Sequence, residues 1–379
     1  MDAYIIDACR TPRGRRNGSL AGVHPIDLCT VPMKAIVERT GIDPARIEDV
    51  VVGCVTECGE QGADIARAAV LAAGWPIDVP GVTLNRFCGS GQQAVNFAAQ
   101  AVAAGAHDLV YGGGVESMSR CAMGSDMGPL PPSLMERYPL VPQGLSAEMI
   151  AEQWRYTRRQ LDEFALESQR RAWAATQEGR FARSLVPVDV TLADGTPKRF
   201  DTDEHVRPQT TLEGLAALKP SFKPDGVIHA GNSSGIVDGA SGVLLASKRA
   251  VKELGLKPRA RIVDTVVVGS EPVIMLTGPI PATHKILKRT GMTMKDIDLV
   301  EINEAFAPVP LITMQEFDIP HEKVNVNGGA IALGHPLGAT GAMLIGTLLD
   351  ELERRDRAVG LSTMCIGYGM GIATIVERV

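Results

Sequence analysis

Short apolar runs rich in Val and Ile alternate along this chain with longer Ala-rich segments. Runs of β-branched residues predict buried strands, whereas the Ala-rich segments predict helices. The predicted strands are the segments 3–7, 49–53, 82–87, 108–113, 242–246, 260–268, 299–302, 324–326, 359–364 and 371–377. Strands that alternate with helices are typical of α/β layers.

The pattern contains a weak internal duplication. In the first half, a predicted strand runs into Cys88-Gly89-Ser90-Gly91 and a helix through Ala104. In the second half, the segment 324–326 precedes Gly334-His335-Pro336 and a helix near 339–355. Because each unit places a polar side chain at the turn that opens a helix, we expect one site to be assembled between them.

The segment 120–236 interrupts this rhythm. Thr157 and Gln160 form a capping-box signal, which predicts a helix running to about Gln177. The segment 201–223 has little periodicity. We therefore predict two α/β halves with a loop domain inserted in the first: 1–119 plus 237–257 form the first half, 120–236 the loop domain, and 258–379 the second half.

Size and charge narrow the function classes. A chain of 379 residues with 45% apolar residues is expected to form two or three packed units. The net charge of −6 argues against nucleic-acid binding, which needs a clustered basic excess. An acidic protein that binds a phosphorylated substrate needs a local basic patch. The candidates for this patch are Arg158, Arg159, Arg207, Lys219 and Lys223, although such residues are usually a solvated surface.

Cysteine usage and the absence of targeting signals predict the compartment. Seven scattered cysteines, an odd number, fit a reducing environment. The first residues are typical of a strand rather than a signal peptide, and no apolar run approaches ~18 residues. We expect a cytoplasmic protein without a membrane span.

Cys88 is the leading candidate nucleophile. It lies between a predicted strand and a helix, where the helix dipole stabilises a thiolate and lowers the pKa of the thiol. The glycines on either side of Ser90 allow a substrate to approach closely. The alternative is that Cys88 is a packed thiol, as most free cysteines are.

Three further segments carry polar side chains with catalytic potential. They are Asn303-Glu304-Ala305-Phe306, Gly334-His335-Pro336 and Cys365-Ile366-Gly367. We expect each to follow an apolar strand, at the sheet edge where ligand crevices of α/β proteins lie. Taken singly, His335 also fits a core histidine, Asn303 a helix cap, Cys365 a buried thiol and Glu304 an orienting carboxylate.

Together, these segments and Cys88-Gly89-Ser90 resemble the four active-site signatures of the thiolase family, in order. The segments 7–12, 113–119, 230–235 and 326–334 are also similar to that family, so the resemblance covers essentially the whole chain. Related condensing enzymes lack the second cysteine. Cys365 therefore favours a thiolase proper over a condensing synthase.

The resemblance implies a five-layered αβαβα fold of two duplicated α/β halves with an inserted loop domain. It implies CoA-dependent cleavage of a 3-ketoacyl-CoA to acetyl-CoA and a shortened acyl-CoA, in β-oxidation. CoA would be a cosubstrate, with no metal and no tightly bound cofactor. It also implies a homodimer or homotetramer.

The resemblance assigns roles to individual residues. Cys88 would be the nucleophile, His335 would take its proton, and Cys365 would act as acid and base. Asn303 would hold a water beside the enolate, and the Gly367 N–H would contribute to an oxyanion hole. The residues expected to contact CoA are Ser234, Arg207 and Phe222.

One departure bears on the substrate. Several acetoacetyl-CoA thiolases read His-Met-Gly where this chain has Pro142-Gln143-Gly144. We therefore predict that acetoacetyl-CoA is not the best substrate, and that the acyl group is longer, branched or ring-bearing. The alternatives are a biosynthetic acetoacetyl-CoA thiolase and a non-catalytic protein that binds CoA thioesters.

Two other motifs carry no function. Gly112-Gly113-Gly114 lacks the complete dinucleotide-binding pattern and its acidic partner. Cys54 and Cys58 have no second pair of ligands at zinc spacing, so packing is the better interpretation.

Overall fold

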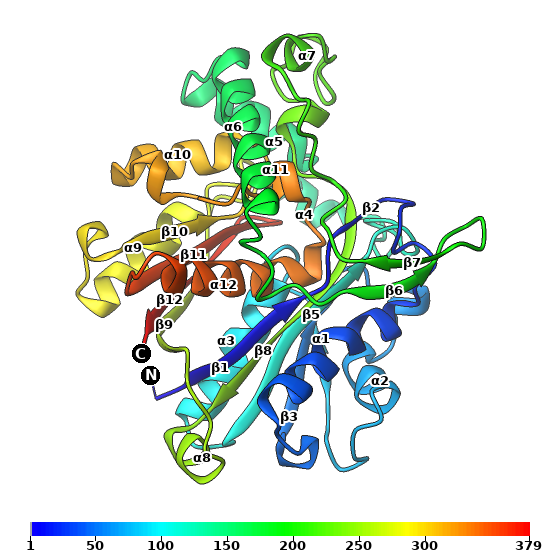
Figure 1. Cartoon of the computed structure of the whole chain (residues 1–379). Helices are drawn as coiled ribbons and strands as arrows, with labels where there is room; N and C mark the ends of the chain where they lie inside the picture. Colours follow the sequence, from blue (N-terminus) through cyan, green and yellow to red (C-terminus); the bar gives the residue numbers. More distant parts are fainter. Residues whose placement is uncertain (1) are drawn as a thin grey trace.

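The computed structural model describes residues 2–379, and a long mixed sheet runs through it (Figure 1). The strands are β1 (Tyr4–Arg10), β2 (Gly14–Arg15), β3 (Asp49–Gly53), β4 (Val82–Leu84), β5 (Leu109–Ser117), β6 (Val188–Thr191), β7 (Pro197–Phe200), β8 (Val237–Ala246), β9 (Ala260–Gly269), β10 (Leu299–Ile302), β11 (Val359–Ile366) and β12 (Met370–Arg378). Neighbouring strands follow the order β10-β11-β12-β9-β1-β8-β5-β3-β4, with β2 paired to β8.

The long sheet consists of two halves joined by a short seam. In the first half, β3 pairs in parallel with β4 and β5, and β8 is antiparallel to β5 and β1. In the second half, β10 pairs in parallel with β11, and β12 is antiparallel to β11 and β9. Only Tyr4 with Arg261 and Ile5 with Ala260 pair across the seam between β1 and β9.

Helices separate and cover the two half-sheets. They are α1 (Pro25–Thr40), α2 (Ile65–Ala72), α3 (Ser90–Ala103), α4 (Pro132–Arg137), α5 (Gln143–Gln153), α6 (Arg158–Gln177), α7 (Leu212–Ala216), α8 (Lys248–Glu253), α9 (Pro279–Thr290), α10 (Pro308–Phe317), α11 (Ala330–Leu333) and α12 (Leu337–Arg354). Helices α3 and α12 share a buried core with strands of both halves. Helices α1 and α2 cover the outer face of the first half, and α9 covers that of the second, which gives the five expected layers.

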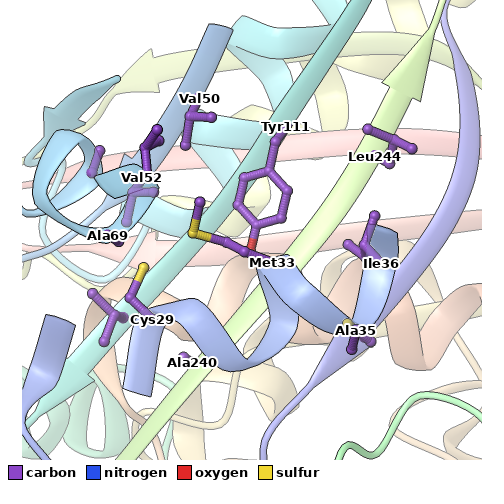
Figure 2. Packing of buried hydrophobic residues seen from close by; sticks show 14 of the residues in the cluster. Cys29, Met33, Ala35, Ile36, Val50, Val52, Ala69, Tyr111, Ala240 and Leu244 are labelled. Atoms are coloured by element: carbon purple, nitrogen blue, oxygen red, sulfur yellow. The ribbon is translucent and has the colours of Figure 1, made fainter. Parts of the chain in front are cut away.

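Strand β3 shows why these apolar runs are continuous. Val50 and Val52 face α1 and pack near Met33 and Tyr111, as Figure 2 shows. Val51 points to the opposite face and joins the core around α3 and α12. Side chains alternate along a strand, so a strand buried on both faces needs an apolar residue at every position. Full burial of one such side chain contributes roughly 1.5–3 kcal/mol.

The segment 120–236 contributes no strand to the large sheet. It holds α4 to α7 and a two-stranded sheet of β6 and β7. Thr157 and Gln160 form the expected capping box at the start of α6. Two buried hydrogen bonds from Arg10 to Asp203, of 2.7 and 2.8 Å, tie the segment to β1. The domain boundaries given above remain a prediction.

The predicted strand at 324–326 is wrong. Asn325 has a left-handed backbone with φ 46°, and the chain there makes only an isolated bridge from Val324 to Val300. The Asn325 side chain takes the place of a strand partner, because its Oδ1 accepts from the Ile302 N–H and its Nδ2 donates to the Ile302 carbonyl, both at 2.8 Å. The strand predicted at 82–87 ends at Leu84, and β2, β6 and β7 were not predicted.

Candidate active site

The first turns of α3 and α12 lie against each other, between the two half-sheets. Each helix begins two residues after a candidate catalytic side chain, Cys88 for α3 and His335 for α12. A Cβ on Gly91 would lie 2.5 Å from the Gly338 carbonyl oxygen, so the two helix starts approach this closely only because Gly91 is glycine. The duplicated arrangement therefore brings Cys88 and His335 to the same end of the helix pair.

A cavity of about 400 Å3 opens beside Cys88 and Gly367. Its wall is largely apolar and comes from both halves and from the segment 120–236. The wall includes Val55, Phe87, Met123, Met127, Val141, Gln143, Phe222, Phe306, Leu337 and Tyr368. An apolar cavity with a few polar groups at one end is typical of a site for an organic ligand.

The Cys88 thiol is buried, and its electrostatics differ from the expectation. Burial raises its pKa to about 11, although the Gln143 side chain and the backbone N–H groups of Cys88 and Gly367 act on the sulfur in the opposite direction. The prediction of a lowered pKa is therefore wrong. Loss of solvent outweighs the hydrogen-bond donors and the helix start.

His335 is held in one tautomer. Its Nδ1 lies 2.6 Å from the Thr340 hydroxyl, which donates its own proton to the Pro336 carbonyl at 2.9 Å. The hydroxyl must therefore accept from an Nδ1–H, which leaves the lone pair on Nε2. Burial, with a smaller contribution from Arg13, lowers the pKa of His335 to about 3, so the imidazole is neutral and Nε2 can accept a proton.

Asn303 and Cys365 complete the polar cluster. The Asn303 Nδ2 lies 3.3 Å from the His335 Nε2. The backbone N–H of Asn303 donates to the Thr363 carbonyl at 3.1 Å. Cys365 follows two residues later in β11, fully buried. Its pKa is raised by burial and further by the charge of Cys88, so the two sulfurs interact electrostatically. The Asn303 Oδ1 is buried and has no hydrogen-bond partner among residues 2–379.

Two expectations about this cluster need correction. Asn303 is not a helix cap, because α10 begins only at Pro308. Cys365 lies inside β11, and His335 follows the short helix α11, so only Asn303 comes directly after a strand. The residues still converge, because β10 and β11 are paired neighbours and Asn303 reaches across to His335.

Two buried carboxylates hold the loops around the cluster. Glu304 accepts from the Ser168 hydroxyl at 2.6 Å, the Asn325 Nδ2 at 2.9 Å and the Ile331 N–H at 3.1 Å, as expected of an orienting carboxylate. Glu116, at the end of β5, accepts from the backbone N–H groups of Val55, Thr56 and Gly338. It thereby fixes the start of α12.

Sequence reasoning missed Glu116 and Thr340. For Glu116 a signal was present, because a carboxylate in a buried apolar and glycine-rich strand must be satisfied by donors. The role of Thr340 has no sequence signal of its own, since it depends on the turn that carries His335.

The three residues expected to contact CoA differ in their position relative to the cavity. Phe222 lines the cavity, and its ring centroid lies 5.9 Å from that of Phe306. The Ser234 N–H donates to the carbonyl of Ala305, the residue before Phe306, at 2.9 Å, and Ser234 does not line the cavity. Arg207 is exposed and lies outside the cavity wall.

The predicted basic patch is smaller than expected. Arg158 and Arg159 pair with Asp162 and Glu163 on their own helix. Three exposed cations are left as candidates for a phosphate site, namely Arg207, Lys219 and Lys223. Within residues 2–379, no group of three or more His, Cys, Asp or Glu side chains is placed to hold a metal ion.

Comparison with known proteins places the chain. Residues 3–249 match the model of the thiolase N-terminal domain, and residues 256–378 match that of the thiolase C-terminal domain. The chain is 46% identical to the steroid 3-ketoacyl-CoA thiolase FadA6 of Mycobacterium tuberculosis, with 100% of this chain and 94% of the relative covered. It is 44% identical to a beta-ketoadipyl-CoA thiolase of Acinetobacter baylyi, with 100% and 99% covered.

The fold agrees with these sequence matches. The crystal structure of human mitochondrial 3-ketoacyl-CoA thiolase superimposes with a TM-score of 0.93 at 38% identity, over 100% of this chain and 99% of that one. The crystal structure of the Bacillus anthracis acetyl-CoA acetyltransferase gives the same TM-score and identity over the same shares of the two chains. The chain therefore belongs to the thiolase family of acyltransferases.

Proposed function

We propose that this protein is a 3-ketoacyl-CoA thiolase that works through an acyl-enzyme on Cys88, with CoA as cosubstrate. The observation that carries the proposal is the tautomer of His335. A neutral imidazole with an unprotonated Nε2, which lies 3.3 Å from the Asn303 Nδ2, is suited to accept the proton of a thiol presented at the start of α3.

The first half-reaction forms the acyl-enzyme. Cys88 transfers its proton to the His335 Nε2, and the thiolate attacks the C3 carbonyl of the substrate. The resulting oxyanion accepts hydrogen bonds from the backbone N–H groups of Cys88 and Gly367, which in this structure act on the Cys88 sulfur. Loss of one such donor typically lowers the rate ~10²–10³-fold.

Cleavage of the C2–C3 bond then releases the enolate of acetyl-CoA. Its oxygen is stabilised by the protonated His335 and by a water held on the Asn303 Oδ1, which is an unpaired buried acceptor in the described chain. Cys365 protonates C2. In the second half-reaction, the Cys365 thiolate takes the proton of the CoA thiol, and the CoA sulfur attacks the acyl group on Cys88. The bond between the acyl group and Cys88 then breaks, and the Cys88 thiolate regains its proton from His335.

The cavity supports an uncharged, bulky acyl group. Asp126 is the one charged side chain in its wall within residues 2–379, so a terminal carboxylate would meet no cation there. This disfavours the β-ketoadipyl substrate named for one relative and favours the apolar, ring-bearing kind named for the steroid thiolase. We propose degradation of longer, branched or ring-bearing acyl groups rather than acetoacetyl-CoA synthesis.

The proposal extends to the setting of the enzyme. No helix within residues 2–379 is long and apolar enough to cross a membrane, and we propose a cytoplasmic enzyme without a tightly bound cofactor. Strand β4 is an edge strand of the large sheet. Four large apolar side chains in or near this edge are exposed, namely Leu71, Ile77, Val82 and Phe97. An apolar sheet edge favours pairing with a second copy, so we propose a homodimer or a homotetramer.

Thiolysis tests the function. Purified protein is incubated with CoA and a series of 3-ketoacyl-CoAs, from four carbons to long and ring-bearing chains, and the mass on the Cys88 peptide is measured. We expect acyl-Cys88, release of acetyl-CoA, and a maximum beyond four carbons. Binding of acyl-CoA with no acylation and no cleavage in the whole series would instead indicate the non-catalytic alternative.

A further inference from the structure

Gln143 is a polar side chain in a mostly apolar cavity wall. It is the first residue of α5 and belongs to the segment 120–236, and it lines the cavity together with Cys88 and Gly367. Its Nε2 lies 3.6 Å from the point where a Cβ on Gly367 would stand. The Gln143 amide therefore lies beside the backbone N–H that acts on the Cys88 sulfur.

The ionisable groups around the Cys88 sulfur and the cavity offer little to stabilise a negative charge on that sulfur. Glu116 on β5 acts on it as a like charge, and Cys365 on β11 is another buried thiol. Asp126 in the cavity wall is also acidic. His335, before α12, is neutral because Nδ1 alone carries a proton.

We propose that Gln143 is a catalytic residue whose Nε2 donates a hydrogen bond to the Cys88 thiolate. The segment 120–236 then supplies a third donor to the nucleophile, beside the two backbone N–H groups. This inference rests on the proposed role of Cys88 as nucleophile.

The chemistry of the amide supports this orientation. A thiolate only accepts hydrogen bonds, so the Nε2 rather than the Oε1 of Gln143 must face it. A hydrogen bond to an ionised partner is stronger than one to a neutral thiol, so the contact favours the thiolate. In agreement, Gln143 is the largest of the influences that lower the pKa of Cys88 against burial.

The alkylation rate of Cys88 tests the donor. Wild type, Gln143→Met and Gln153→Met are treated with iodoacetamide between about pH 7 and 9, and carbamidomethylation of the Cys88 peptide is followed by mass spectrometry. Gln153 is the exposed last residue of the same helix, so its replacement is a matched control. Gln143→Leu and Gln143→Glu also lack the amide donor, and they are prepared in case Gln143→Met does not fold.

We expect a pKa rise of about one unit in Gln143→Met. A more basic thiolate is also more nucleophilic, so the rate falls only about threefold at each pH. Gln143→Glu is slower still, because a carboxylate repels the thiolate, and Gln153→Met matches wild type. Equal rates for wild type and a folded Gln143→Met overturn the inference. Failure of wild type to cleave any 3-ketoacyl-CoA refutes the proposed function instead. The alkylation rates can still be interpreted in that case, because they do not depend on substrate cleavage.

Discussion

The rings of Phe87 and Tyr368 meet edge to face, with centroids 5.0 Å apart and planes at 82°. Both residues have left-handed backbones, with φ of 44° and 61°. Phe87 directly precedes Cys88, and Tyr368 directly follows Gly367. A left-handed conformation costs roughly 1–2 kcal/mol per residue, and an aromatic pair returns about 0.5–1.5 kcal/mol. The ring contact thus helps to hold two unfavourable turns that present the sulfur and its donors.

The first prediction concerns the cavity wall at Tyr368. Tyr368→Gly removes backbone strain but also removes the ring that lines the cavity. We expect the unfolding free energy to change by no more than about 1 kcal/mol. We also expect cleavage of short substrates to slow about tenfold, while the chain-length maximum moves to larger acyl groups. Rates over the substrate series check this, and an unchanged profile would show that Tyr368 does not shape the pocket.

The second prediction concerns the tautomer of His335. Thr340→Val keeps the shape of the side chain but removes the acceptor of the Nδ1–H. The imidazole can then adopt the wrong tautomer, so we expect kcat to fall about 10²-fold with KM nearly unchanged. Thr340→Ser restores the hydroxyl and should recover most of kcat. A Ser variant as slow as the Val variant would contradict the orienting role.

The third prediction is a loss of stability in acid. Burial lowers the pKa of His335 from 6.5 to about 3, and burial lowers those of His205 and His321 to about 4. These three histidines therefore bind protons below about pH 6.5 in the unfolded chain but not in the folded chain, so their contribution to the unfolding free energy falls as the pH drops through this window. Urea unfolding between about pH 7 and 4.5 measures the slope. His335→Gln should make the slope shallower, and an identical slope would contradict the assignment.

The fourth prediction concerns the exposed edge of the first half-sheet. Phe97→Glu places a charge on the apolar surface beside β4. If a second copy covers this edge, burial of the carboxylate is costly, so the variant should be a monomer. Light scattering after size-exclusion chromatography gives the mass. Trp173→Glu, an exposed aromatic on α6, is the matched control and should behave like wild type.

Much of the fold was predictable because strands that are buried on both faces of a sheet appear in the sequence as short runs of mostly apolar residues. The segment 49–53, which holds three consecutive valines, and the segment 299–302, which is apolar except for Glu301, form strands with the predicted bounds. The prediction failed at 324–326, where a similar apolar pattern contains Asn325, whose amide completes the bonding of β10. The presence of an Asn in the sequence does not reveal whether its side-chain amide will bond to the backbone of a neighbouring strand.

The candidate site was predictable as a set of residues, whereas its electrostatics were not. Cys88, His335, Asn303 and Cys365 come from distant parts of the sequence, and their motifs and the duplication indicated that they meet. The pKa of Cys88 was predicted in the wrong direction. The helix that begins after Cys88 can be recognised in the local sequence, whereas the burial that raises the pKa depends on the folding of the whole chain. The proximity of Gln143 to the sulfur depends likewise on how the segment 120–236 folds back.

The buried pairing of Arg10 with Asp203 has a consequence for how substrate reaches the sulfur. A guanidinium that lies deep in the protein and holds both carboxylate oxygens resists separation, since either partner left alone would be an unpaired charge out of water. The segment that forms one side of the acyl pocket is thereby anchored to the central sheet. Because this pairing restrains the segment 120–236 relative to β1, we expect an acyl-CoA to enter the cavity without a large displacement of that segment.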